Sequence, residues 1–362
     1  MSTRVYYPSQ ALFVKRAGAA GAYSFVHGVQ TASDDAQLPK QDINQWGQLE
    51  VYQRIEDTPE ISLDVERVLD GYAPLYLAAT VGSTLASLTG RQDKESILAI
   101  GIYSDTADYV GQGAADPVKI VEFSGMQVNS ISYSFTTDGA FTESLNFIGN
   151  YMEWSDGDSP KYGTLPADPT GGGDDEPLAK TDCLGGVQFK ESLVFDSGED
   201  YHCILPTQIP GIKPNGRNEI VSGQCPTVNI QSVEISADLS RERIPSLGCR
   251  GDYAKLATFP VDVNVSISIL LQEGHQVSVT ENGALPTGGA CPNDRTNSPD
   301  QSFRLVTKSG LVIDCGDKLK LDGVSTSYGD ASGGNATADF TFVGKSILSV
   351  YHINDPSSIA LP

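Results

Sequence analysis

The side chains that most often carry catalysis or bind metals are sparse and scattered in this 362-residue sequence. No histidine has a second histidine three to five residues away, which excludes HExxH-type metal motifs. The four histidines are His27, His202, His275 and His352. No GxSxG nucleophile motif is present. These residues predict no metal site, no cofactor and no catalytic residue.

The six cysteines all lie in the second half of the chain and form no CxxC pair, so their spacing does not indicate a zinc cluster. They are Cys183, Cys203, Cys225, Cys249, Cys291 and Cys315. Their even number permits disulfides, but the first half has no cysteine, which is atypical of a disulfide-dependent secreted scaffold. Buried, reduced thiols are therefore the expectation.

The charge of the chain is strongly acidic: Asp and Glu number 46 against 24 Lys and Arg, a formal net charge of −22. Binding to nucleic-acid phosphates or anionic lipid depends on clustered Lys and Arg, so this balance argues against both. No apolar run approaches the roughly 18 residues of a membrane span, and the first residues lack a long apolar segment. Neither a membrane span nor a targeting signal is expected.

Acidic loops offer the remaining candidates for chemistry. The stretches SDGDSP (155–160) and DSGED (196–200) resemble weak calcium ligands, but neither has the spacing of an EF-hand loop, so solvated carboxylates are favoured. A glycosidase-type carboxylate pair assembled from distant loops stays open as an alternative. Two tryptophans are few for a sugar-stacking cleft. We predict that the protein is not an enzyme.

The chain repeats a pattern, which indicates a tandem duplication of one domain. Residues 29–59 align with 230–260 at an offset of 201, and seven of the 31 pairs are identical. These are Gln30/Gln231, Ala36/Ala237, Leu38/Leu239, Ile43/Ile244, Gly47/Gly248, Tyr52/Tyr253 and Pro59/Pro260. Residues 126–150 align with 321–345 at an offset of 195, again with seven identities. They include Tyr133/Tyr328, Gly139/Gly334, Phe147/Phe342 and Gly149/Gly344.

The segments after Pro59 and Pro260 are predicted strands. In VDVNVSISIL (261–270) apolar residues alternate with polar ones, as in a half-buried strand. EISLDVERVLDG (60–71) alternates too, although its apolar residues also fit one face of a helix. Because 261–270 has no helical alternative, a strand is predicted for both segments. The apolar positions of the two segments are out of phase by one residue in the alignment, which implies a one-residue insertion or bulge near the strand start. The polar positions are Glu60, Asp64, Glu66, Asp262, Asn264, Ser266 and Ser268.

Other segments complete a mainly β prediction. A hairpin is expected over 128–150 around the Asp138-Gly139 turn, with a counterpart strand at Phe340 and Phe342. Short helices are expected around Ala73–Thr80 and within Gln92–Ile100. A first strand of the second copy is expected at VQFKESLVF (187–195), followed by a Pro-stiffened loop, LPTQIPGI (205–212).

The predicted organisation is two tandem domains of β-sandwich or barrel-like type with short helices. The first covers 1–152 and the second 185–362. Between them, 153–184 is rich in acidic residues, Gly and Pro, and too polar to form a core, so it is predicted to be an interdomain linker.

The runs LPTQIPGI, NIQSVEISADLSRERIPSLGCRGDY and FPVDVNVSISI resemble the tail tube proteins of long-tailed bacteriophages. Those proteins carry an I-Q-S-V-x-I-S-like strand, a charged R-E segment, an L-G-x-x-G turn and an F-P-V-[DE]-V strand. The resemblance covers about residues 205–275, and the first copy keeps only its skeleton, with Trp46-Gly47 in place of Leu247-Gly248. It implies a domain whose long strands join those of neighbours into a ring-shaped inner β-barrel, with rings stacked into a hollow tube.

The resemblance therefore implies a structural virion protein: the major tail tube subunit of a conduit for phage DNA ejection. Since one domain would supply a sixth of a ring, three chains would close a pseudo-sixfold homotrimer. Expected partners are further copies of the chain and other tail proteins (tape measure, tail terminator and baseplate), in a virion tail assembled in the host cytoplasm. The alternatives are a baseplate or decoration protein with tandem β domains, or an extracellular adhesin.

The polar faces of the two strands suggest a function for the acidity. If Glu60, Asp64 and Glu66 line the bore of a tube together with the polar residues of 262–268, the wall repels DNA phosphates and the genome passes without specific binding. The competing interpretation is that these are solvent faces of outer strands.

Overall fold

The computed structural model describes twelve stretches of the chain. They are residues 9–17, 23–80, 87–104, 117–157, 159–166, 186–195, 201–212, 216–218, 228–248, 251–271, 300–328 and 335–353. The predicted DSGED loop and most of the predicted linker lie outside these residues, as do Gly334, His275 and four of the cysteines.

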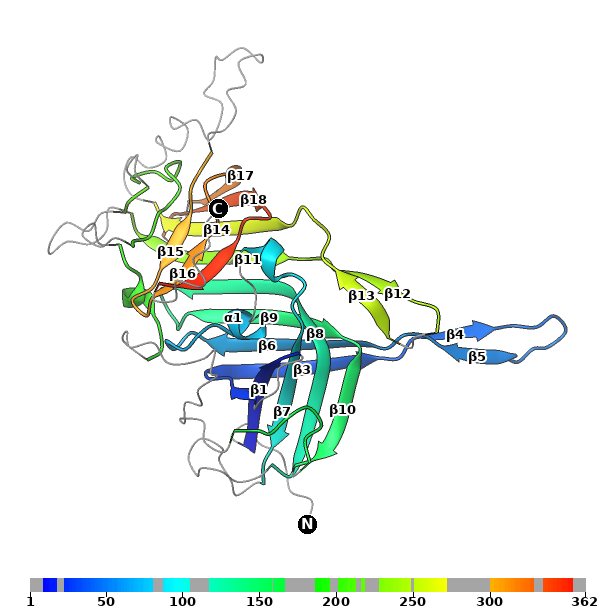
Figure 1. Ribbon diagram of the computed structural model, residues 1–362. Coiled ribbons are helices and arrows are strands. Elements are labelled where there is room, and N and C mark those ends of the chain that lie inside the picture. Colours follow the sequence, from blue (N-terminus) through cyan, green and yellow to red (C-terminus); the bar gives the residue numbers. More distant parts are fainter. Residues whose placement is uncertain are drawn as a thin grey trace.

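A long antiparallel run of strands forms the body of the protein (Figure 1). It includes strands from both halves of the chain, in the order β3-β6-β9-β8-β11-β14-β18-β17. The bounds are β3 (Val29–Gln37), β6 (Glu60–Val68), β9 (Thr142–Gly149), β8 (Lys119–Thr136), β11 (Ile230–Asp238), β14 (Asp262–Leu270), β18 (Thr337–Lys345) and β17 (Lys320–Ser327). The mainly β prediction is confirmed, but the two halves share one continuous sheet, joined where β8 pairs with β11.

Strand β8 belongs to two parts of the sheet. Residues 127–136 pair with β9 and β11, whereas residues 119–126 pair with strands at the bottom of Figure 1. Gly125 lies where the partners change and has φ +64, a left-handed conformation that favours glycine. The strands beyond it are β7 (Ser96–Ile102), β1 (Gln10–Arg16), β2 (Ser24–Phe25) and β10 (Tyr151–Asp156).

Smaller elements surround this sheet. Two hairpin arms project from one side of the body in Figure 1. The first arm is β4 (Lys40–Ile43) with β5 (Gln53–Glu56), and the second is β12 (Glu242–Pro245) with β13 (Asp252–Leu256). The remaining elements are a sheet of β15 (Arg304–Val306), β16 (Leu311–Asp314) and β19 (Ser349–His352), and short helices α1 (Leu75–Ala79), α2 (Leu88–Arg91) and η2 (Lys190–Ser192).

The two halves of the long sheet have the same strand order. Strands β3-β6-β9-β8 of the first half correspond to β11-β14-β18-β17 of the second. The registers match as well: Ala36 pairs with Ile61 as Ala237 pairs with Val263, and Leu63 pairs with Phe147 as Val265 pairs with Phe342. The predicted one-residue slip is an extra residue in the second half. The arm registers and the Ala36 and Ala237 pairings place it between the second arm and β14.

The residues of the repeated motif occupy matching positions. Gln30 and Gln231 each lie at a register shift, in β3 and β11 respectively. Gly47 and Gly248 lie in the two arm turns, and both have φ +85. Pro59 and Pro260 each come just before the strand that follows the arm.

Part of the sequence alignment is wrong. In the first half, Tyr133 on β8 pairs with Glu143 on β9. In the second half, Ala338 corresponds to Glu143, and it pairs with Thr326. The structural counterpart of Tyr133 is therefore Thr326 and not Tyr328. The connection between β17 and β18 is therefore two residues longer than that between β8 and β9, which a gapless alignment does not allow for. The identities in 142–149, on β9, are in the correct register.

Three predicted elements also need correction. The segment from Ser96 is strand β7, not a helix, because SILAIGI is an apolar run buried between β1 and β8; the helix before it is α2. The segment 187–195 contains η2 and an isolated bridge instead of a strand. Strand β10 continues to Asp156, so the predicted domain boundary at 152 lies within a strand. The helix α1 and the hairpin β8–β9 are confirmed.

Apolar side chains that alternate along the strands form the core. Phe147 and Phe342 are fully buried at corresponding positions, and so are Leu63 and Val265. Cys203 and Cys315 are buried free thiols, and burial raises the pKa of Cys203 to about 12. For these two cysteines, the expectation of buried reduced thiols is confirmed.

A buried carboxylate connects the sheet to helix α1. Glu143 on β9 is fully buried, and burial raises its pKa although its hydrogen bonds and Arg67 oppose the shift. Its oxygens accept hydrogen bonds from the backbone N–H groups of Leu75 (2.8 Å) and Tyr76 (3.1 Å) and from the Tyr133 hydroxyl (3.0 Å). The Nε of the equally buried Arg67 lies 3.8 Å from it. Glu143 thus satisfies the start of a helix whose own N-cap is proline.

Glu143→Ala is expected to destabilise the protein by about 3–5 kcal/mol, because it removes the carboxylate beside a buried guanidinium and leaves three hydrogen-bond donors without their acceptor. Arg67 itself keeps its bonds to Asp70 (3.0 Å) and to the Ala73 carbonyl oxygen (2.9 Å). Chemical denaturation monitored by circular dichroism measures this loss. Glu153→Ala serves as the control, since Glu153 is a half-exposed partner of Lys161 and its removal should change little. Equal unfolding midpoints for the two variants would contradict the assigned role.

Candidate functional site

The face of the long sheet that lies opposite the core is mostly polar from one half to the other, with Ile148 and Val343 among its apolar members, and we call it the polar face. Its residues alternate with the buried ones on every strand from β6 to β18. One cross-strand row consists of Glu66, Ser144, Ser132, Ser236 and Asn264, which are neighbours in register. The next row consists of Thr142, Ser134, Glu234, Ser266 and Thr341. Small hydroxyl side chains therefore dominate the middle of this face.

All seven residues predicted to line a bore lie on the polar face. Glu60, Asp64 and Glu66 lie on β6, and Asp262, Asn264, Ser266 and Ser268 lie on β14. Strands β9, β8 and β11 lie between the two sets, so they are parts of one surface and not two separate faces.

The carboxylates of this face differ in their partners. Glu60 forms an ion pair with Arg243 of the second arm (2.9 Å), and Asp262 pairs with Lys345. Asp64 accepts a hydrogen bond from the Asn146 amide (2.7 Å). Glu60 and Asp262 are therefore not free carboxylates, because cationic side chains reach both strand starts.

The sequence-based choice of residues missed half of the polar face. Glu234 and Asp238 on β11 and Asp339 on β18 add carboxylates to it, and β8 adds a column of hydroxyls. The column consists of Ser130, Ser132, Ser134 and Thr136. The alternation in VNSISYSF and SVEIS carries the signal, but only the register shows that these strands are adjacent.

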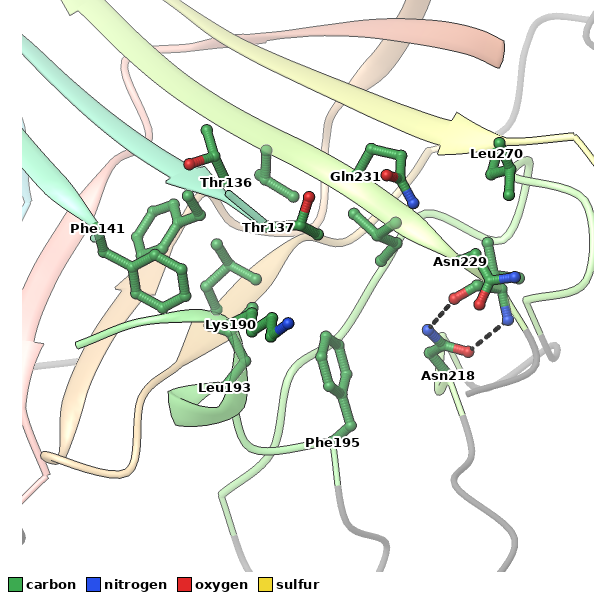
Figure 2. Close-up of a pocket in the computed structure, with 15 residues that line it drawn as sticks. Thr136, Thr137, Phe141, Lys190, Leu193, Phe195, Asn218, Asn229, Gln231 and Leu270 are labelled. Atoms are coloured by element: carbon green, nitrogen blue, oxygen red, sulfur yellow. Dashed lines mark hydrogen bonds between the residues drawn. The ribbon is translucent and has the colours of Figure 1, made fainter. Parts of the chain in front are cut away.

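A pocket of about 460 Å³ opens at one end of β8, β11 and β14 (Figure 2). Aromatic and aliphatic side chains form most of its wall, and the Asn218 amide both donates to and accepts from the backbone of Val228 (3.0 Å each). Among the described residues that line it, Lys190 is the one with an ionisable side chain. A single amine without a carboxylate, imidazole or thiol partner does not make an acid–base pair, so this pocket does not favour catalysis.

Within the described stretches, no group of three or more His, Cys, Asp or Glu side chains is placed to hold a metal ion. The helices in those stretches are too short to span a lipid bilayer.

Comparisons with known proteins give partial likenesses. No protein-family model and no curated protein matches the chain. A chain from the baseplate of the anti-feeding prophage, solved with 6-fold symmetrisation, is 12% identical with a TM-score of 0.32, and covers 43% of this chain and 98% of its own. A chain from the cap that terminates the tube of the same particle is 8% identical with a TM-score of 0.31, and covers 43% of this chain and 93% of its own. TM-scores this low correspond to partial superposition and do not establish a shared function.

Proposed function

We propose that this protein is a structural subunit of a phage-type tail, and specifically the major tail tube subunit, whose polar face lines the conduit for DNA. The observation that carries the proposal is one sheet built from two halves of equal strand order, with its polar face continuous across the junction. The sequence resemblance of residues 205–275 to tail tube proteins supports the same assignment. The matching orders and registers support an internal duplication, in which each half supplies one of six ring positions.

The chemistry of the polar face suits a conduit. Hydroxyl groups present no net charge to a passing polyanion, and the carboxylates repel its phosphates. The cations at this face are each paired: Lys345 on β18 with Asp262, Lys320 on β17 with Asp300, and Arg243 of the second arm with Glu60. A surface of this kind binds DNA weakly, as free passage requires.

The expected assembly is a ring of three chains with pseudo-sixfold appearance, stacked into tubes. Negative-stain microscopy of the purified protein should show tubes, and averaged end views should have threefold chain symmetry with six similar positions. True sixfold chain symmetry, with one half of each chain outside the ring, would contradict the trimer. Particles without any tube would favour the second candidate, a baseplate or decoration protein with tandem β domains.

A further inference from the structure

Corresponding positions of the two halves differ sharply in exposure at one edge of the sheet. Leu38, after β3, is 63% exposed, whereas its counterpart Leu239 is 2% exposed. Ala36 is exposed and Ala237 is buried to 2%; Asp34 is exposed where the second half has the fully buried Ile235. The second half is covered here because β11 pairs with β8 of the first half. Among the described residues, β3 pairs with β6 alone.

The opposite edge of the sheet lacks the matching neighbour. Strand β17 corresponds to β8, yet within the described chain it pairs with β18 alone, and most of its residues are exposed. One molecule thus has an edge that corresponds to β8 and another that corresponds to β11. Within the chain, the strands that correspond to these two edges, β8 and β11, pair with each other.

We propose that β17 of one chain pairs antiparallel with β3 of the next, in the register of the β8–β11 junction within each chain. This pairing rests on the proposed ring-forming function and specifies its contact. In the junction, Ser132 pairs with Ser236 and Ile131 with Ala237. The corresponding pairs between chains are Ser325 with Asp35 and Val324 with Ala36.

The edge of β3 has a complementary shape for this contact. A hollow of about 400 Å³ lies beside Ala36 and Leu38 and is otherwise lined by Pro59, Ile61, Asn150, Tyr151 and Met152. Val324 pairs with the buried Phe340 and so lies on the apolar side of β17. In the proposed register it stands opposite Ala36, where it would enter this hollow and be removed from water.

The arms give a second, independent contact of the same kind. Arg241, at the base of the second arm, lies against the first half. It donates to the carbonyl oxygens of Val128 (2.7 Å) and Gln92 (2.6 Å) and to the Gln127 side chain (2.9 Å). Lys255 donates to the carbonyl oxygen of Gly125 (3.0 Å). Their counterparts on the first arm, Lys40 and Arg54, are exposed. The first arm would therefore lie on the second half of the neighbouring chain.

The geometry of the junction selects a cysteine pair for the test. Antiparallel strands alternate between hydrogen-bonded and non-hydrogen-bonded residue pairs. The backbone N–H of Leu239 donates to Asn129 (2.8 Å) and that of Thr137 to Gln231 (3.1 Å), which makes both of these hydrogen-bonded pairs. By alternation, Ser132–Ser236 is a non-hydrogen-bonded pair. Cα atoms of such pairs lie about 4.5 Å apart, within the range of a disulfide. Asp35→Cys with Ser325→Cys reproduces this pair between chains.

The double variant should form disulfide-linked chains under mild oxidation, seen as a ladder on a non-reducing gel. Asp35→Cys with Thr326→Cys is the matched control, since Thr326 points to the other side of β17, and roughly tenfold less product is expected from it. Each single-cysteine variant measures the background of disulfides formed with the natural cysteines. Equal linking of both pairs, or of neither, overturns the pairing. Tubes without the specific link leave the proposed function standing and overturn the contact, whereas the specific link without tubes supports the contact and contradicts the function.

Discussion

Ala36→Pro is expected to abolish assembly between chains while each chain keeps its fold. The N–H of Leu239, directly after β11, donates to the Asn129 carbonyl oxygen of β8, so the N–H groups of Ala237 and Ile235 are directed to β8 too. By correspondence, the Ala36 N–H on β3 is directed away from β6 and toward the neighbouring chain. Proline removes this donor and places a ring at the edge, as natural edge strands do to prevent pairing. A loss of about 2–3 kcal/mol per contact weakens each by a factor of roughly 30–150.

Analytical ultracentrifugation measures this loss, with circular dichroism as a check on the fold. Ala36→Ser keeps the N–H and should assemble normally. Asp35→Pro removes a donor directed to β6 and should lower the melting temperature of the chain itself. Normal tubes from a folded Ala36→Pro protein would show that β3 does not pair between chains.

Reversing charge on the polar face is expected to make assembled tubes retain DNA. The variant carries Asp64→Lys, Glu66→Lys and Glu234→Lys, which lie on β6 and β11. Glu60 is left unchanged because its ion pair with Arg243 holds the second arm. Six units of charge per chain are altered, and the repeat along a stack would turn a repelling wall into a cationic one. Binding should be strongest at low salt, because phosphate contacts release counterions.

The amount of double-stranded DNA that binds to purified tubes measures this effect. A more direct measurement is the rate of genome delivery by particles whose tails contain the variant. The control moves the same charge elsewhere, with Asp93→Lys, Glu191→Lys and Asp317→Lys, three exposed acids outside the polar face. Delivery should slow at least about tenfold in the first variant and little in the control, since only a charged bore meets the phosphates. Equal kinetics in both would show that the polar face does not meet the DNA.

The sequence predicted the strands whose pattern is local and could not predict their neighbours. Alternation identified β6 and β14, and comparison between them excluded a helix for the first. The β8–β11 pairing that merges the two predicted domains joins residues about a hundred positions apart, and strand periodicity carries no information about it. Strand β7 was predicted as a helix because its run is apolar on both faces and short, a case in which periodicity does not discriminate.

In the candidate site, too, the sequence predicted the local pattern and not the contacts between distant segments. The seven polar residues were identified from alternation alone, whereas the ion pairs of Glu60 and Asp262 depend on an arm and a strand that are distant in sequence. The repeat likewise showed that two strands correspond, but the insertion in the β17–β18 connection was invisible without the register.

The β8–β11 junction within one chain also has a kinetic meaning. Two half-units joined by a peptide meet at a local concentration set by their linker and not by the supply of protein, so this contact forms as each molecule folds. If three such molecules close a ring, its abundance grows with the third power of subunit concentration, whereas a ring of six separate half-units would follow the sixth. A fused pair can therefore polymerise from a much more dilute pool, and closed rings should accumulate early in synthesis.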